Sequence, residues 1–313
     1  MTPVFVLLLG LLIPTQGLLP AEPTPEPVIE RTTTVARSAH TATWKLGPYR
    51  GLGSWIDMFD PWVWERPEVA VQGMQENGVR TIYLETSNYK KKSAIFKPQK
   101  VARFIVAAHA ANMKIVAWYV PGFDNVRRDY RRTMAAINFT TEDGQTFDGF
   151  AMDIEATVVR DISERNAKLD RLNRRVRSAI GSGPVLGAIT PEAGALYWPY
   201  FPYRSVDQYY DVFLPMGYYT YRVNGKAAVR EFTARQVKTI RSATGNSSQP
   251  VHAIGGIAGV GSPREVAGFV EGAMNNGVIG GSLYDFPITK AKEWEKLQVF
   301  RRTQPAAAGL VSK

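Results

Sequence analysis

The chain has 313 residues, 45% of them hydrophobic, which is enough for one large core or for two domains of ordinary size. It has no cysteine, so disulfide bonds, thiolate metal sites and a cysteine nucleophile are excluded. Its formal net charge of +10 fits a solvated basic surface, or attraction to acidic cell-wall glycans or a membrane surface. Because the basic residues are spread along the chain, no nucleic-acid partner is predicted.

The first 43 residues are predicted to lie outside the folded domain. Residues 4–13 form an apolar run that is too short to span a bilayer comfortably and has the features of a signal-peptide core, with cleavage after Ala21. The alternative is an uncleaved N-terminal anchor over residues 1–21. Residues 22–43 are rich in Pro, Thr, Glu and Ala, which predicts a disordered linker. The chain is therefore expected to be secreted or extracytoplasmic, with attachment to the cell surface as the second possibility.

From Trp44 onward, short runs of β-forming residues alternate with segments of helical periodicity. The predicted strands are Gly51–Met58, Thr81–Thr86, Lys114–Val120, Gly149–Glu155, Val185–Thr190, Val212–Tyr219, Val251–Ile257 and Gly281–Phe286. The predicted helices between them are Pro67–Asn77, Lys100–Asn112, Val158–Ile180, Glu231–Ala243 and Pro263–Asn276. Such alternation indicates parallel strands joined by helical crossovers.

Eight strand–helix units over residues 44–303 predict an α/β fold, a single (β/α)8 TIM barrel, with residues 304–313 as a C-terminal tail. The competing fold is an open, doubly wound sheet. No glycine-rich phosphate loop follows the first strand, so nucleotide binding has no support. No boundary of a second domain is visible, and a monomer is expected.

The most informative strand is Gly149–Glu155, which is apolar and ends in two carboxylates. Alternate residues of a strand share a face, so Asp153 and Glu155 are expected to point the same way. Two acids side by side raise each other's pKa. This arrangement suits acid–base or glycosyl-transfer chemistry, and it makes Glu155 and Asp153 the predicted catalytic residues.

In a (β/α)8 barrel, chemistry takes place at the C-terminal ends of the strands. At these ends the sequence places many carboxylates and aromatic rings. Carboxylates bind hydroxyl groups and aromatic faces stack on sugar rings, so the rim predicts a carbohydrate site. The substrate-binding residues predicted in this way are Asp57, Glu85, Trp118, Glu192, Tyr218, Tyr219, Tyr284 and Asp285.

Other chemistries have less support. The three histidines lie far apart in the sequence, no cofactor is predicted, and no metal site is predicted. The metal alternative is a hard cation held by Asp57, Glu85 and Asp153. A nucleophilic serine is not indicated, because no Gly-x-Ser-x-Gly motif occurs. Asp148, at the start of the fourth strand, is expected to have a structural role.

The segment Asp148–Glu155 resembles the fourth-strand signature of family 18 chitinase-type glycoside hydrolases, Asp-Gly-x-Asp-x-Asp-x-Glu. Leu214–Tyr219 resembles their Met-x-Tyr-Asp segment, and Gly280-Gly281 matches the start of their last strand. The resemblance implies that Glu155 is a general acid and that Asp153 assists the substrate's acetamido group. It also implies that Tyr218 hydrogen-bonds to that group. Two positions differ: Ala151 replaces an inward Asp, and Tyr219 replaces the Asp after the tyrosine.

Two other resemblances apply. Residues 44–300 are similar in pattern to uncharacterised secreted actinobacterial glycosidase-like proteins. Asp153-Ile154-Glu155 also resembles the Asp-x-Glu of family 25 lysozyme-like muramidases, whose first-strand Asp corresponds to Asp57.

The sequence thus predicts a glycoside hydrolase-like barrel that cleaves an exported or cell-wall polysaccharide or oligosaccharide. Glu155 acts as general acid, and Asp153 as assisting carboxylate or nucleophile. A non-catalytic carbohydrate-binding barrel is the alternative, supported by Ala151 and Tyr219. A metal-dependent barrel hydrolase is a third. The acids of the fourth strand could instead be a structural ion pair facing Arg160 or Arg222.

Overall fold

The computed structural model describes residues 45–303. The predictions of a signal peptide or anchor over residues 1–21, a linker over 22–43 and a tail over 304–313 fall outside the described residues. Within residues 45–303, no helix is both long and apolar enough to cross a membrane.

The eight parallel strands form a closed barrel, which confirms the predicted (β/α)8 fold. Their order in the sheet is β6-β5-β4-β3-β2-β1-β8-β7. Parallel bridges from Phe213 to Val251 and from Met216 to Ile254 join β6 to β7 and close the circle. The strands are β1 Gly51–Ile56, β2 Thr81–Asn88, β3 Lys114–Val120, β4 Gly149–Asp153, β5 Leu186–Thr190, β6 Val212–Pro215, β7 His252–Ile257 and β8 Gly280–Tyr284.

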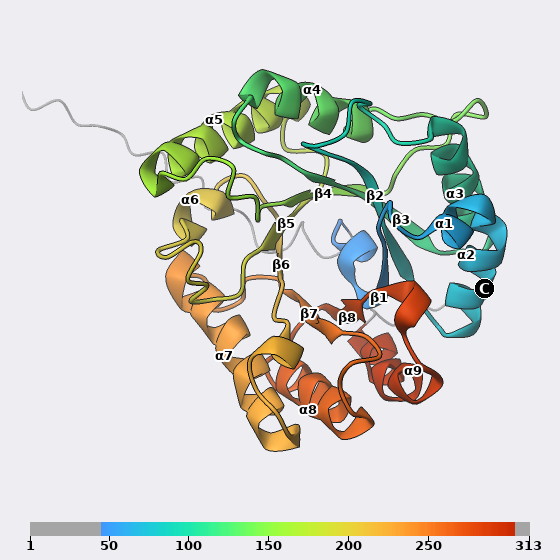
Figure 1. The fold of residues 1–313 in the computed structure, drawn as a ribbon, viewed down its shortest axis with the longest axis vertical. Coiled ribbons are helices and arrows are strands. Elements are labelled where there is room, and N and C mark those ends of the chain that lie inside the picture. The colour runs from blue at the N-terminus through green and yellow to red at the C-terminus, as the bar shows by residue number, and fades with distance from the viewer. Residues whose placement is uncertain (1–44, 304–313) are drawn as a thin grey trace, which may run out of the picture. The chain divides into compact units, whose positions relative to one another are not determined.

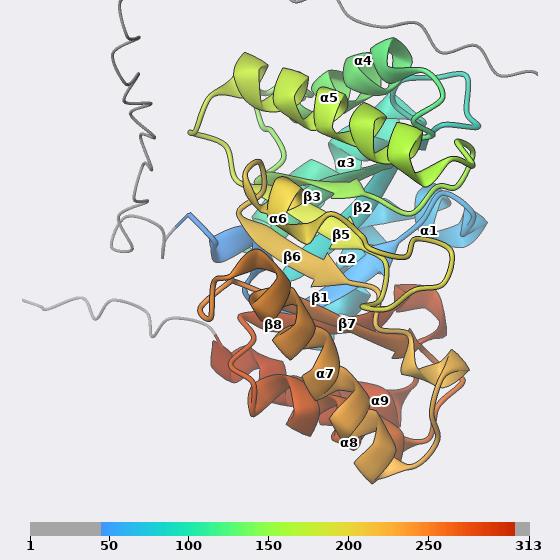
Figure 2. The same ribbon diagram turned by 90° about the vertical axis from the view of Figure 1, so that its left-hand side faces the viewer.

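Helices surround the strands in a ring (Figure 1), and the view turned by 90° shows α4 and α5 on one side of the barrel and α7, α8 and α9 on the other (Figure 2). The α-helices are α1 Pro61–Glu65, α2 Pro67–Glu76, α3 Pro98–Ala110, α4 Val126–Ile137, α5 Ile162–Ile180, α6 Tyr203–Asp207, α7 Lys226–Thr244, α8 Pro263–Met274 and α9 Ala291–Leu297. Short 3-10 helices are η1 Gly47–Tyr49, η2 Tyr219–Tyr221, η3 Phe286–Ile288 and η4 Gln298–Thr303.

Helix α4 has no counterpart among the predicted helices, although its sequence has apolar residues at helical spacing, and polar residues share its buried face. The apolar residues that pack against the core are Val126, Tyr130, Met134 and Ile137. Asp129, Arg132 and Thr133 are buried on that face. Asp129 accepts hydrogen bonds from the Tyr119 hydroxyl at 2.7 Å and from the Phe123 amide at 2.9 Å. Because charged residues fill most positions between the four apolar residues, the segment is polar overall in spite of its helical spacing.

Several strands end earlier than predicted, because the chain turns into short helices or loops at the mouth of the barrel. Strand β4 ends at Asp153 rather than at Glu155, and β6 ends at Pro215 rather than at Tyr219. The predicted alternation of faces in β4 nevertheless holds. Phe150, Met152 and Ile154 pack into the layer between strands and helices, and Ala151 packs inside the barrel.

The floor of the barrel, at the N-terminal ends of the strands, is filled by Tyr49 and His252. The Tyr49 hydroxyl donates to the Phe150 carbonyl at 2.7 Å. His252 Nδ1 lies 2.9 Å from the Tyr49 carbonyl, and its Nε2 lies 3.0 Å from the Ser282 hydroxyl. Burial lowers the pKa of His252 to about 4, so the ring is neutral near pH 7. His252 is therefore part of the floor and lies at the opposite end of the barrel from the mouth.

Candidate active site

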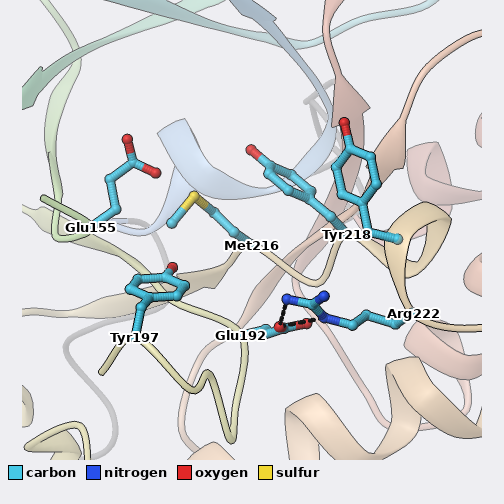
Figure 3. A pocket seen from close by; sticks show the side chains of 7 residues that line it. Glu155, Glu192, Tyr197, Met216, Tyr218 and Arg222 are labelled. Atoms are coloured by element: carbon cyan, nitrogen blue, oxygen red, sulfur yellow. Dashed lines mark hydrogen bonds and ion pairs between the residues drawn. The ribbon is translucent and has the colours of Figure 1, made fainter. Parts of the chain in front are cut away.

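A cavity of about 230 Å³ opens at the C-terminal ends of the strands. Its walls combine acidic, aromatic and basic side chains. Glu155 and Tyr197 lie on one side of it, and Tyr218 and Arg222 lie on the other (Figure 3). The lining residues are Glu155, Glu192, Tyr197, Met216, Tyr218, Tyr221 and Arg222.

Asp153 is the last residue of β4 and is only 6% exposed. Its Oδ1 is buried without a hydrogen-bond partner among the described residues. Burial raises the pKa of Asp153 well above its usual range, and the charges of Glu155 and Glu85 raise it further. A buried carboxyl oxygen without a partner has a high free-energy cost, and such groups cluster at functional sites.

Glu155 follows two residues later and lies at the cavity wall. Surrounding protein raises the pKa of Glu155 by desolvation, and the charge of Lys90 opposes this. The residue is nevertheless exposed. Because water reaches the carboxyl group through the mouth, we take the upward shift of its pKa to be smaller than that of Asp153. The predicted pair thus has one deeply buried member and one member open to a substrate.

Glu85 comes from β2 and is 2% exposed. Its carboxylate accepts hydrogen bonds from the Met58 amide at 3.1 Å and from Asn88 Nδ2 at 3.0 Å. Burial raises the pKa of Glu85 to about 7, in spite of these two donors. The strand register shifts between Glu85 and Ser87, an irregularity of the kind that often re-aims side chains next to active sites.

The raised pKa of Glu85 predicts a pH-dependent stability. As pH rises from the unfolded value near 4.3 towards about 7, the unfolded chain releases a proton that the folded chain retains, so the free energy of unfolding falls. We expect Glu85→Gln to reduce this fall. The glutamine side chain has one acceptor oxygen for the two donors, the Met58 amide and Asn88 Nδ2, so the variant also loses stability at every pH. The informative quantity is therefore the slope of the free energy of unfolding against pH. Urea unfolding from pH 4 to pH 8 measures it, and parallel slopes for the two proteins would contradict the prediction.

Asp57, Asp60 and Asp285 form a cluster where β1 and β8 end. One oxygen from each lies within 4.8 Å of the others. Burial raises the pKa of Asp285 to about 8 and that of Asp60 to about 6, with the neighbouring charges adding to both shifts. Asp60 and Asp285 also share a side-chain hydrogen bond, which indicates a proton held between these two acids. In the described part of the chain, Asp57 is thus grouped with Asp60 and Asp285, so the alternative of a cation bound by Asp57, Glu85 and Asp153 loses support.

Of the four aromatic residues predicted to bind substrate, Tyr218 lines the cavity and the other three do not. Tyr284 donates to Asp57 Oδ2 at 2.8 Å, and its ring centroid lies 6.2 Å from that of Tyr218. Trp118 is buried beside Trp55 and, within residues 45–303, has no partner for its indole N–H. Tyr219 does not line the cavity. It is 1% exposed and packs against Phe269 between the barrel and its helices.

Glu192 lies in the cavity wall and is paired with Arg222, whose Nε donates to it at 2.6 Å. Arg222 therefore neutralises Glu192 rather than Asp153 or Glu155, and the described residues show no ion pair to either of those acids. This argues against the interpretation of the β4 acids as a structural ion pair.

Asp148 has the structural role expected of it. It accepts hydrogen bonds from Lys114 Nζ at 2.7 Å and from the Ile115 amide at 2.9 Å, and His109 Nε2 lies 3.1 Å away. Tyr197 is a lining residue that the sequence did not indicate. It lies in an irregular segment between β5 and α6, where no periodic pattern places a side chain.

Comparisons with known proteins support the fold alone. No family model matches the chain, and no curated protein matches it. Among solved structures, the exo-β-1,4-mannosidase Op5Man5 from Opitutaceae bacterium strain TAV5 is similar with a TM-score of 0.62 at 12% identity, over 81% of this chain and 59% of that one. The present chain therefore spans little more than half of that mannosidase.

Two further structures cover more of their own length. The endo-β-1,4-mannanase from Thermotoga petrophila has a TM-score of 0.62 at 10% identity, over 82% of this chain and 77% of that one. A class V chitinase mutant from Cycas revoluta, in complex with (GlcNAc)3, has a TM-score of 0.60 at 11% identity, over 81% and 99%. The chain thus has the TIM-barrel fold seen in these glycoside hydrolases.

Proposed function

We propose that the protein is a glycoside hydrolase that acts on an exported or cell-wall polysaccharide. The observation that carries the proposal is the buried Asp153, with an unpartnered oxygen, two residues before the exposed Glu155 at the wall of an open cavity. A structural acid would be expected to have a hydrogen-bond partner or a cation. The location at the C-terminal end of β4 and the shared fold are consistent with this function.

Glu155 is proposed to donate its proton to the glycosidic oxygen as the bond to the anomeric carbon breaks. Asp153 faces the developing positive charge, either as the nucleophile or as the carboxylate that assists an acetamido group of the substrate. Water then adds to the anomeric carbon, and its proton restores the acid. Burial raises the pKa of Asp153 well above its usual range, so the proposed mechanism requires that substrate binding favours the ionised form of Asp153 and the protonated form of Glu155.

The aromatic side chains of the cavity suit a sugar substrate. Tyr197 and Tyr221 are 42% and 65% exposed, so their rings are available for stacking. Burial raises the pKa of Tyr218 well above its usual range, so its hydroxyl remains a hydrogen-bond donor at every physiological pH. Tyr218 is the proposed ligand of a substrate oxygen next to the reacting carbon.

Glycan release tests the function. The full chain, and a chain starting at residue 44, would be incubated with chitin oligosaccharides, peptidoglycan, mannan and acidic polysaccharides, with Glu155→Gln alongside. We expect the wild type to release reducing ends from one class and the variant to release none. The anomeric form of the first product, read by proton NMR, distinguishes retention from inversion. No release from any substrate would overturn the proposal.

A non-catalytic carbohydrate-binding barrel is the second candidate. Ala151 provides no carboxylate inside the barrel, and Tyr219 is buried away from the cavity. Retained binding of one glycan without release by the wild type would favour this candidate. We also propose a monomer that works outside the cytoplasm. Light scattering and cell fractionation test these two points.

A further inference from the structure

Building on the proposed function, we propose that the segment between β2 and α3 forms a subsite for an anionic group, a carboxylate or a sulfate, on the sugar bound beside Glu155. The segment contains the run Lys90-Lys91-Lys92. Lys90 acts electrostatically on Glu155, and Lys91 acts on Glu85. The three lysines do not line the cavity, so the subsite would lie beside its wall, within electrostatic range of Glu155 and Glu85, and would select charged glycans over neutral ones.

The backbone of this segment is held from below by α4. Arg132 is 4% exposed, and its guanidinium donates to the Asn88 carbonyl at 2.7 Å and to the Lys91 carbonyl. The Asn88 side chain links the segment to the site, because it donates to Glu85 and accepts from the Lys90 amide at 3.0 Å. The lysines thus extend from a fixed backbone, which lowers the entropy lost when a ligand binds.

The neighbouring strand β3 holds the same segment from the side. The Tyr89 amide donates to the carbonyl of Val120 in β3 at 2.9 Å. The far end of the segment is tied back to β2, because the Phe96 amide donates to the Thr86 carbonyl at 2.7 Å. A Cβ added at Gly122 would lie 2.9 Å from Tyr89 Cβ, so glycine is what allows the two loops to pack together. These contacts fix the backbone from which the lysines extend.

Within the described residues, the lysine ammonium groups form no ion pair with an acid. None of the ion pairs between residues 45 and 303 involves Lys90, Lys91 or Lys92, whereas Arg222 is paired with Glu192. Lys91 Nζ lies 5.2 Å from the centroid of the Phe59 ring, and that ring is 67% exposed. A cation beside an exposed aromatic face matches a sugar that carries a negative charge.

The lysines could instead only balance the acids of the site. Against this, burial raises the pKa of Glu85 to about 7 and that of Asp285 to about 8, so these two acids are largely or partly protonated at neutral pH. The exposed Glu155, on which Lys90 acts, offsets at most one of the three lysine charges. An anionic ligand group would supply further negative charge.

Binding to matched polymers tests the subsite. In the Glu155→Gln background, calorimetry would compare hyaluronan and polygalacturonate with their carboxyl-reduced forms, and chondroitin sulfate with unsulfated chondroitin. We expect an anionic form to bind more tightly, and Lys90→Gln/Lys91→Gln to weaken its binding about tenfold while binding to neutral forms is unchanged. Raising the ionic strength should weaken the same binding. Tighter binding than to the carboxyl-reduced polymers identifies a carboxylate as the bound group, and tighter binding of chondroitin sulfate than of unsulfated chondroitin identifies a sulfate.

The control removes two charges elsewhere. Arg80 directly precedes β2 at the floor, and Lys238 lies on α7, and both are exposed. Arg80→Gln/Lys238→Gln should leave binding unchanged. An equal loss of affinity in both double variants would mean that only overall charge matters and would overturn the subsite.

Binding to no anionic polymer would also overturn the subsite. A charge preference that depends on the lysines, with no glycan release by the wild type, would support the subsite and refute the proposed hydrolase. Glycan release from neutral glycans alone would support the hydrolase and refute the subsite.

Discussion

Replacing Glu155 with glutamine is expected to lower kcat by about 10²–10⁴-fold, the usual contribution of a general acid, while glycan affinity changes by less than about twofold. Glutamine has nearly the same shape as glutamate but cannot donate a proton to the glycosidic oxygen. Glu155 is exposed at the cavity wall, so the substitution should leave stability unchanged. Steady-state kinetics and calorimetry on the same preparation measure both quantities.

The leaving group provides the sharper measurement. An aryl glycoside with an acidic phenol leaves without protonation, so Glu155→Gln should retain far more activity on it than on the natural glycan. The control is Glu142→Gln, an exposed acid in the loop before β4 at the other end of the barrel. Equal losses on both substrates would mean that Glu155 holds the substrate rather than protonates it.

Replacing Asp153 with asparagine is expected to abolish turnover and to make the protein more stable above neutral pH. The activity is lost because asparagine has no charge to face the reacting carbon. Stability increases because the burial that raises the pKa of Asp153 penalises its ionised form. Each kcal/mol gained should raise Tm by about 2–4 °C in a domain of this size.

The sign of the effect depends on pH. Near pH 3 both folded and unfolded chains carry a protonated Asp153, so the wild type and Asp153→Asn should unfold alike. As pH rises through the unfolded value near 3.9, only the unfolded chain releases the proton, and the wild type loses stability relative to the variant. Thermal unfolding from pH 3 to pH 8.5 measures the difference. A variant less stable than the wild type at pH 8.5 would show that Asp153 makes a stabilising interaction.

The barrel could be predicted because apolar strands and periodic helices alternate along the chain, and the boundaries of β3 and β7 are close to those expected. Helix α4 is missing from the predicted helices although Val126, Tyr130 and Met134 have helical spacing. What could not be predicted is how Asp129 and Arg132, which are buried on this helix, find their partners. Both residues are satisfied by partners distant in sequence, Tyr119 for Asp129 and Asn88 for Arg132. Patterns within a short window do not contain such pairings.

In the site too, local patterns could be predicted from the sequence and contacts between distant segments could not. The parity of β4 correctly places Ala151 inside the barrel and Met152 outside it, because alternation is a local property. Tyr219 was expected at the rim on the assumption that β6 continues to it, but the chain turns after Pro215 and the ring enters the outer core. Tyr197 reaches the cavity from an irregular loop, and only the assembled structure brings it there.

The first strand and the last 3-10 helix meet at the floor of the barrel, where the Gly51 amide donates to the Thr303 hydroxyl at 3.1 Å. The mouth opens at the opposite end of the strands. Both ends of residues 45–303 therefore lie at the floor, and a polymer too large to enter the barrel could still lie across the mouth. The same closeness of ends makes this barrel suitable for circular permutation, with new termini placed in a surface loop.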